Sequence, residues 1–174
     1  MDIACNSGFW SVQCALLGAE VVGFDTRREL IEEAILVKRT TGVGNVEFRI
    51  LDFWDMNPES LGGKFDIVLC LGILYHLPRP IDALRLVKSI CREHILLDTQ
   101  IYPSVDPVAE FFWEEPDDIR DANRSGIVMI PSKGAVAMIL REISVTDSVE
   151  IPLRTNDMPE DYIGHRRASW LVSV

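Results

Sequence analysis

The sequence is short of positive charge. Its 174 residues include 17 Lys and Arg against 27 Asp and Glu, which gives a formal net charge of −10 at pH 7. Proteins bind nucleic acids through clustered Lys and Arg that neutralise phosphates, so this balance disfavours a broad nucleic-acid surface. It still allows a local basic patch.

Long apolar runs and metal-ligand clusters are missing as well. No stretch approaches the roughly 18 uninterrupted apolar residues of a transmembrane helix, and we find no basic segment leading into an apolar one. The four cysteines are scattered, at Cys5, Cys14, Cys70 and Cys91. Without paired spacing they predict free thiols in a reducing compartment. We therefore expect a cytoplasmic protein with no membrane partner and no metal.

The most informative stretch begins at Asp2. Small residues follow this acidic residue as far as Gly8, an apolar stretch then runs to Gly18, and a second apolar run ends on Asp25. This order predicts a strand end, a tight turn, a helix and a second strand, the first half of a nucleotide-binding βαβ unit. A turn of small residues lets a ligand approach the backbone, and the helix N-terminus points N–H groups at it. Asp25 is then placed to accept hydrogen bonds from ribose hydroxyls.

A dinucleotide site would need Gly-x-Gly-x-x-Gly at this turn, which the chain lacks. The spacing Asp2-x-Ala4-x-Asn6-x-Gly8 instead resembles motif I of the class I S-adenosylmethionine-dependent methyltransferases, usually Asp/Glu-x-Gly-x-Gly-x-Gly. Ala4 and Asn6 stand where that family most often has glycine. A plain αβ turn without a ligand is the alternative for this motif alone.

A second stretch, residues 64–77, looks like motif IV of the same family, the FDxVxxxxxLyHl run after the fourth strand. The resemblance implies a Rossmann-like fold that binds S-adenosylmethionine and releases S-adenosylhomocysteine (SAH). It assigns cofactor contacts to Asp2, Ala4, Cys5, Asn6, Gly8, Asp25, Asp52, Phe53, Leu71 and Gly72. Within this set, Asp52 and Phe53 would contact the adenine amino group and ring. The alternative for Asp52 is a cap on the short turn at residues 58–61.

Strand-like and helix-like segments alternate along the chain, which predicts a single α/β domain over residues 1–174 with a doubly wound, mostly parallel sheet. We expect strands at 20–24, 46–51, 65–71 and 94–98, and an antiparallel C-terminal edge from 145–153 and 168–174. We expect helices at 9–17, 26–39, 81–90 and 134–142. Thr26 with Glu29 reads as a capping box, and Ser132 as a cap. Residues 99–131 predict an irregular lid or substrate loop.

The chain opens so close to motif I that we expect its central strand and the N-terminal helices typical of the family to be truncated. A narrower resemblance rests on residues 2–11, 72–77 and 130–132, which are similar to the wobble-uridine tRNA methyltransferase-like proteins. The resemblance to that branch does not identify a substrate. Given the acidic balance, we expect a small-molecule acceptor and regard tRNA as disfavoured.

The sulfonium methyl group of the cofactor is already activated, so the protein must chiefly hold an acceptor in line with it. An oxygen or nitrogen acceptor also needs to lose a proton. We predict His76 as the general base and Tyr75 as an orienting group, although both residues could simply pack. Trp113 could stack on a planar acceptor or lie buried under the lid.

Charged segments near these residues are expected to be surface features: residues 114–118 as a solvated acidic edge, and Arg166-Arg167 as a surface pair that could alternatively meet an anionic substrate. Three functions follow. The first is methyl transfer to an O or N acceptor. The second is a binding or regulatory module that has lost catalysis. The third is an NAD-type oxidoreductase, which shares Asp25 but not the glycine turn.

Overall fold

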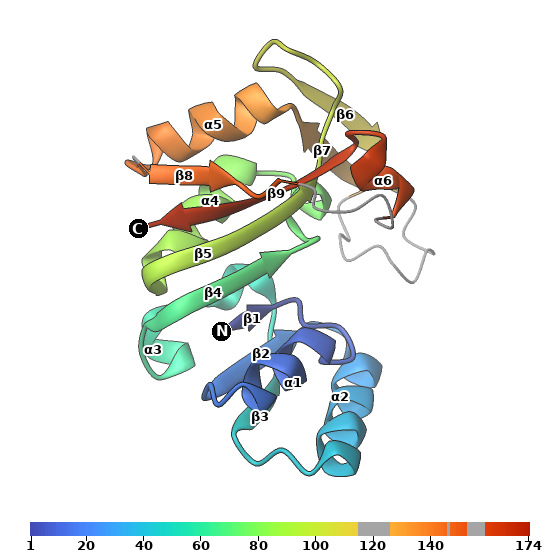
Figure 1. Cartoon of the computed structure of the whole chain (residues 1–174), viewed down its shortest axis with the longest axis vertical. Helices are drawn as coiled ribbons and strands as arrows, with labels where there is room; N and C mark the ends of the chain where they lie inside the picture. Colours follow the sequence, from blue (N-terminus) through green and yellow to red (C-terminus); the bar gives the residue numbers. More distant parts are fainter. Residues whose placement is uncertain (115–125, 146, 153–158) are drawn as a thin grey trace.

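The computed structural model describes residues 1–114, 126–145, 147–152 and 159–174. Its main feature is a seven-stranded sheet in the order β3-β2-β1-β4-β5-β9-β8 (Figure 1). The strands of this sheet are β1 Asp2–Ile3, β2 Val21–Asp25, β3 Val46–Ile50, β4 Phe65–Leu71, β5 Cys91–Gln100, β8 Asp147–Glu150 and β9 Arg167–Ser173. The first five run parallel, and β9 is antiparallel to both β5 and β8. The predicted fold class is confirmed.

Helices cover both faces of the sheet. They are α1 Phe9–Leu16, α2 Arg28–Thr41, α3 Pro58–Leu61, α4 Pro80–Ser89, α5 Lys133–Glu142 and α6 Glu160–Ile163, with 3-10 turns η1 Phe53–Asp55 and η2 Leu74–His76. In Figure 1, α1 lies in front of β2 and α2 lies to the right of β2 and β3, whereas α4 lies behind β5. The larger apolar core forms where α4 and α5 bury residues such as Leu84 and Val136. A smaller one, built on Ala15, Val21 and Val46, lies under α1.

The order of the strands reverses at β1, which is flanked by β2 on one side and β4 on the other. Right-handed crossovers then place successive helices on opposite faces, and the crevice at the carboxyl ends of these strands is where open α/β sheets bind ligands. Strand β1 has two residues and pairs with both neighbours. The amino group of Met1 donates to the Ile67 carbonyl at 2.9 Å, which continues the ladder.

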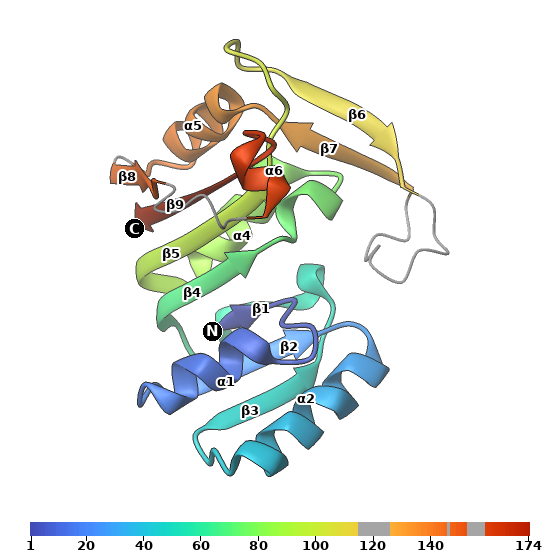
Figure 2. The same ribbon diagram turned by 45° about the vertical axis from the view of Figure 1, so that its right-hand side comes forward.

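The prediction of an irregular segment at 99–131 was wrong for much of its described part. Strand β5 continues to Gln100, and β6 Ala109–Trp113 pairs with β7 Ile127–Pro131 as a separate antiparallel ribbon (Figure 2). Both strands are aromatic or β-branched at most positions, which favours extended backbone. Their pairing is non-local, and the turn-forming residues around them obscured it.

Two capping predictions also differ from the structure. Helix α2 begins at Arg28 with Arg27 as its N-cap, and no side chain caps it. The Asp25 carboxylate accepts the Arg27 amide at 3.0 Å, which closes the turn that leads into the helix. The short helix α3 is capped by Asn57, through a reciprocal pair with Ser60, and not by Asp52. The Ser132 cap on α5 is confirmed by its bond from the Ala135 amide.

Candidate functional site

The turn between β1 and α1 has left-handed backbone at three positions of the motif. The φ angles are 52° at Ala4, 52° at Asn6 and 80° at Gly8. These are the positions where motif I of the methyltransferases usually carries glycine, so the chain keeps the backbone conformation without all of the glycines. Asparagine tolerates this region, but alanine is strained there.

This strain gives a stability prediction. Replacing Ala4 with glycine should raise the free energy of unfolding by about 0.5–1 kcal/mol, because relief of the left-handed strain exceeds the entropy that glycine adds to the unfolded chain. The helical substitution Ala15→Gly is the matched control and should lower stability. Urea denaturation of both variants measures the difference, and an A4G variant that is less stable than the parent would contradict strain at Ala4.

Gly8 is required where it stands. A Cβ atom at this position would lie 2.6 Å from Cζ of Phe48 and 3.0 Å from Cβ of Ala34, so any side chain would displace β3 or α2. Gly8 is also the N-cap of α1, and no side chain caps that helix. The first turn of α1 therefore presents its backbone N–H groups at the carboxyl end of β1, an arrangement suited to a polar ligand.

The first acidic residue of the motif lies beneath this turn. Asp2 is 3% exposed, and the Ser11 hydroxyl donates to its carboxylate at 2.6 Å. Burial raises the pKa of Asp2 to about 6, and the hydrogen bond from Ser11 opposes part of that increase. Asp2 is thus a carboxyl that changes charge in the weakly acidic range.

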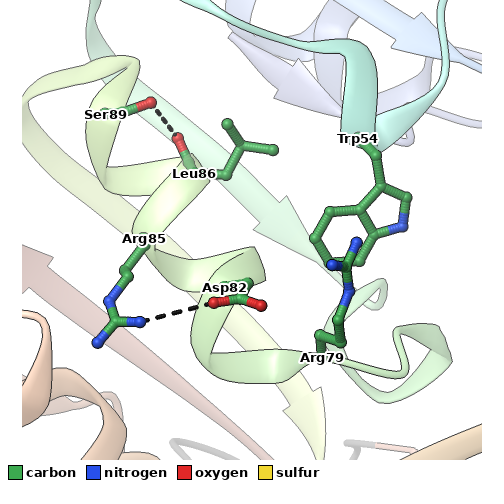
Figure 3. Close-up of a pocket in the computed structure, with 6 residues that line it drawn as sticks. All are labelled: Trp54, Arg79, Asp82, Arg85, Leu86 and Ser89. Carbon is green, nitrogen blue, oxygen red and sulfur yellow. Dashed lines mark hydrogen bonds and ion pairs between the residues drawn. The ribbon is translucent and has the colours of Figure 1, made fainter.

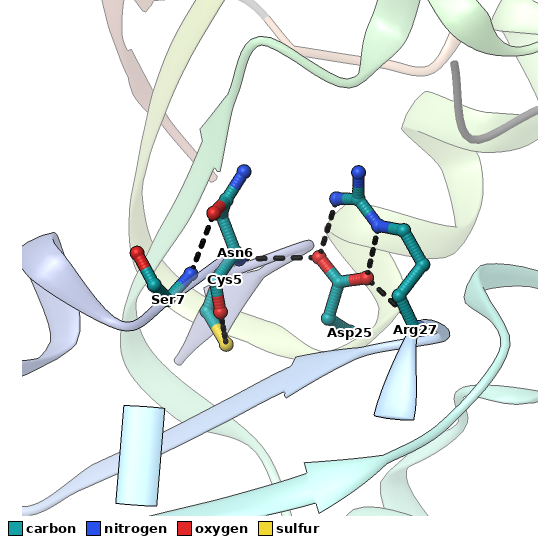
Figure 4. A network of polar contacts seen from close by, with 5 residues as sticks. All are labelled: Cys5, Asn6, Ser7, Asp25 and Arg27. Carbon is teal, nitrogen blue, oxygen red and sulfur yellow. Dashed lines mark hydrogen bonds and ion pairs between the residues drawn. The ribbon is translucent and has the colours of Figure 1, made fainter. Parts of the chain in front are cut away.

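Asp25 lies at the end of β2 and faces the turn (Figure 4). Its carboxylate accepts the Asn6 amide at 3.1 Å, the Arg27 amide at 3.0 Å, and two guanidinium N–H groups of Arg27 at 2.9 Å each. The Asn6 contact ties the motif I turn directly to the strand-end aspartate. Two residues that the sequence assigned to one cofactor site are therefore in contact.

The predicted adenine contacts lie at the end of β3. Asp52 is exposed, and its side chain accepts the Trp54 amide at 2.9 Å as the cap of η1. Phe53 is 7% exposed and packs in the larger core, with its ring edge-on to Trp54 at 5.1 Å. Asp52 is thus accessible at the carboxyl edge of the sheet, whereas most of the Phe53 ring is covered.

An open groove of about 390 Å³ lies beside Trp54 and along α4 (Figure 3). The guanidinium of Arg79 stacks over the Trp54 ring at 4.3 Å, and Arg85 pairs with Asp82 at 3.5 Å. None of the predicted cofactor residues lines this groove. It is therefore a separate surface feature.

At the end of β4, Leu71 and Gly72 lie next to a polar cluster. A Cβ atom on Gly72, whose φ is 76°, would lie 2.8 Å from the guanidinium of Arg167. That guanidinium bonds to Asp98 at 2.7 Å, and it contacts the Tyr75 hydroxyl at 3.5 Å. The Asp98 carboxylate also accepts the hydroxyls of Tyr162 and Ser169. The expected surface role was wrong for Arg167, whose side chain is 18% exposed.

His76 is buried and pairs with a carboxylate. Its Nδ1 lies 2.5 Å from Oε1 of Glu114, and the side chains are 11% and 6% exposed. The prediction of a solvated edge was wrong for Glu114, which follows β6 and points inward; residues 115–118 lie outside the described residues. The Tyr75 ring lies 4.1 Å from the His76 ring, so both predicted catalytic residues lie side by side. Trp113, in contrast, is 60% exposed and not buried under a lid.

The polar residues that sequence reasoning did not place near these groups include Arg27, Asp98 and Glu114. A signal existed for Asp98, because it lies near the carboxyl end of a strand just as Asp25 does. None existed for Glu114, whose partner is 38 residues away, or for the pairing of Asp98 with Arg167, which are 69 residues apart.

Comparison with known proteins identifies the family. The profile of a methyltransferase domain family matches residues 1–112, which include both motifs and the strands β1 to β5. The chain belongs to this family. The resemblance to class I S-adenosylmethionine-dependent methyltransferases is thereby confirmed.

The names of two curated relatives point to different kinds of acceptor. This chain is 34% identical over 92 residues to ubiquinone biosynthesis O-methyltransferase of Xanthomonas axonopodis pv. citri, and the alignment covers 53% of this chain and 38% of that protein. It is 31% identical over 113 residues to tRNA U34 carboxymethyltransferase of Campylobacter hominis, and this alignment covers 63% of this chain and 39% of that protein. The chain thus spans about two fifths of the length of these relatives.

Solved structures share the fold of the methyltransferase domain. The N-terminal domain of EvdMO1 with SAH bound superposes with a TM-score of 0.78 at 23% identity, covering 99% of this chain and 71% of that one. Magnesium protoporphyrin IX methyltransferase (ChlM) from Synechocystis PCC 6803 with bound SAM gives a TM-score of 0.61 at 20% identity, covering 99% and 66%.

Within the described ranges, no group of His, Cys, Asp and Glu side chains is arranged to hold a metal ion. The helices of those same ranges include none long and apolar enough to cross a membrane.

Proposed function

We propose that this chain binds S-adenosylmethionine at the carboxyl ends of β1, β2 and β4 and transfers its methyl group to an oxygen or nitrogen acceptor. The observation that carries the proposal is the contact between the motif I turn and Asp25, which joins two predicted cofactor elements in one network. Two of the solved structures that share the fold contain bound SAH or SAM. When bound, the cofactor supplies an activated methyl group.

The residues around the turn fit such a ligand. The left-handed turn and Gly8 keep side chains away from the approach to α1, and Asp25 offers carboxylate oxygens to a ribose. Asp52 is exposed at the end of β3, where an adenine amino group could donate to it. The site thus combines a backbone platform with two carboxylates at neighbouring strand ends.

The acceptor side of the proposal rests on His76 and its neighbours. Glu114 fixes one ring nitrogen of His76, which orients the imidazole for proton removal from an acceptor. Tyr75 lies between His76 and the guanidinium of Arg167, so a hydroxyl and a cation line the same region. We favour a small-molecule acceptor, because the net charge of −10 opposes binding to tRNA phosphates.

Substitution of Asp25 tests the cofactor part. Asp25→Ala should weaken SAH binding by about 1–3 kcal/mol, roughly 5- to 150-fold, because hydrogen bonds to a charged acceptor are lost. Asp66→Ala is the matched control: it breaks an exposed ion pair with Arg92 at 3.0 Å at the opposite end of the sheet and should leave binding unchanged. Calorimetric titration compares the variants, and equal affinities would remove Asp25 from the site.

Methyl transfer itself is tested by SAH release from S-adenosylmethionine in the presence of phenol, amine and tRNA acceptors. Turnover with a phenol or an amine supports the small-molecule assignment, and turnover with tRNA alone would overturn it. A chain that binds SAH but turns over none of the three classes would favour the catalytically inactive binding module.

A further inference from the structure

The carboxylate of Asp25 is fully occupied within the protein. Its side chain is 1% exposed. Oδ1 accepts the amide and Nε of Arg27, whereas Oδ2 accepts the Asn6 amide and Nη2 of Arg27 (Figure 4). A carboxylate offers about four lone-pair positions in total, two on each oxygen. All of them are therefore used before any ribose arrives.

The four donors are not equally replaceable. The Asn6 and Arg27 amides belong to the two turns that shape the site, so removing them would require backbone movement at both strand ends. The two guanidinium contacts come from a side chain that is 20% exposed and can rotate away. A ribose diol brings two hydroxyl donors, which matches the number of contacts that the guanidinium releases.

We infer that Arg27 is a residue of the cofactor site that competes with the ribose hydroxyls for Asp25. This inference rests on the proposed function, because it takes the ligand to be an adenosyl cofactor. Binding exchanges two charge-assisted hydrogen bonds from the guanidinium for two from the 2′- and 3′-hydroxyls. The apparent affinity is reduced by the fraction of molecules in which Arg27 holds the carboxylate.

The ion pair between Arg27 and Asp25 stabilises the chain when the ligand is absent. An ionised carboxylate that is buried without a counter-charge is costly, and Arg27 neutralises Asp25 in that state. The exchange also sets a requirement on the ligand. A nucleoside with both ribose hydroxyls replaces both guanidinium contacts, whereas a 2′-deoxy analogue replaces one and leaves one carboxylate position unfilled.

The test compares SAH affinity in Arg27→Met with the parent chain. Removal of the competing guanidinium should tighten SAH binding by about tenfold, given the strength of charged hydrogen bonds. Arg28→Met, which removes the same charge from the exposed neighbouring residue, should bind like the parent. Arg27→Lys, which cannot make the paired contact, should fall between the two and serves where Arg27→Met folds poorly.

A second arm asks whether the effect acts through Asp25. In an Asp25→Ala background, Arg27→Met should have no effect on SAH affinity, because the carboxylate for which the guanidinium and the ribose compete is absent. Unchanged or weaker SAH binding by Arg27→Met in the native background would overturn the inference while leaving the cofactor assignment intact. Absence of SAH binding by the parent and by every variant would instead refute the proposed function and, with it, the exchange.

Discussion

Replacing His76 with glutamine should lower methyl-transfer turnover by about 10²–10⁴-fold, the range expected when a general base is lost. Glutamine keeps an amide near Glu114 and fills a similar volume, so the fold should survive and SAH affinity should change little. The expected reason for the loss is chemical: an amide cannot accept the acceptor's proton near neutral pH. SAH release on an acceptor found by screening measures the effect.

His94→Gln is the control for this substitution. His94 lies near the start of β5, at the opposite end of the strand from the site, so its replacement should leave turnover unchanged. Glu114→Gln tests the orienting carboxylate and should lower turnover while leaving SAH affinity intact. Full turnover by a folded His76→Gln variant would show that His76 packs at η2 and is not the base.

The second large effect concerns stability and pH. The pKa of Asp2 is raised to about 6 in the folded chain from an ordinary value of 3.8, so the folded state holds this proton more tightly than the unfolded state. The protonated carboxyl therefore favours folding below about pH 4, and this contribution is lost as the pH rises through about 6. The loss amounts to about 3 kcal/mol above that pH.

Asp2→Asn should remove this dependence. Asparagine keeps an oxygen that accepts the Ser11 hydroxyl but carries no charge to bury. We expect the variant to be more stable than the parent by up to about 3 kcal/mol at pH 7.5, and to match it near pH 4. Urea titrations at the two pH values decide the point. Equal stability at both would mean that Asp2 titrates as an ordinary exposed carboxyl.

Local sequence patterns predicted most of the fold. The spacing of small residues from Asp2 to Gly8 predicted the turn, and the apolar run at residues 65–71 predicted strand β4 with the bounds that it has. Backbone geometry explains why the motif survives substitution: Ala4 and Asn6 adopt the left-handed conformation that glycine would adopt. The capping prediction at Thr26 was wrong because the helix begins one residue later, after a turn in which the Asp25 carboxylate accepts the Arg27 amide.

Pairings between distant segments could not be predicted in this way. Glu114 read as part of an acidic run, and only the folded hairpin of β6 and β7 brings it to His76. Arg167 read as surface charge, and only β9, inserted beside β5, brings it to Asp98. Sequence patterns report periodicity and turn chemistry, whereas contacts between buried charges depend on which strands become neighbours.

We expect this chain to hold an adenosyl cofactor at the turn between β1 and α1. Calorimetric titration with SAH, with NAD as the control ligand, measures this binding. We expect a single site with micromolar affinity for SAH and no measurable binding of NAD. Binding of NAD in preference to SAH would refute the adenosyl site and favour the oxidoreductase alternative.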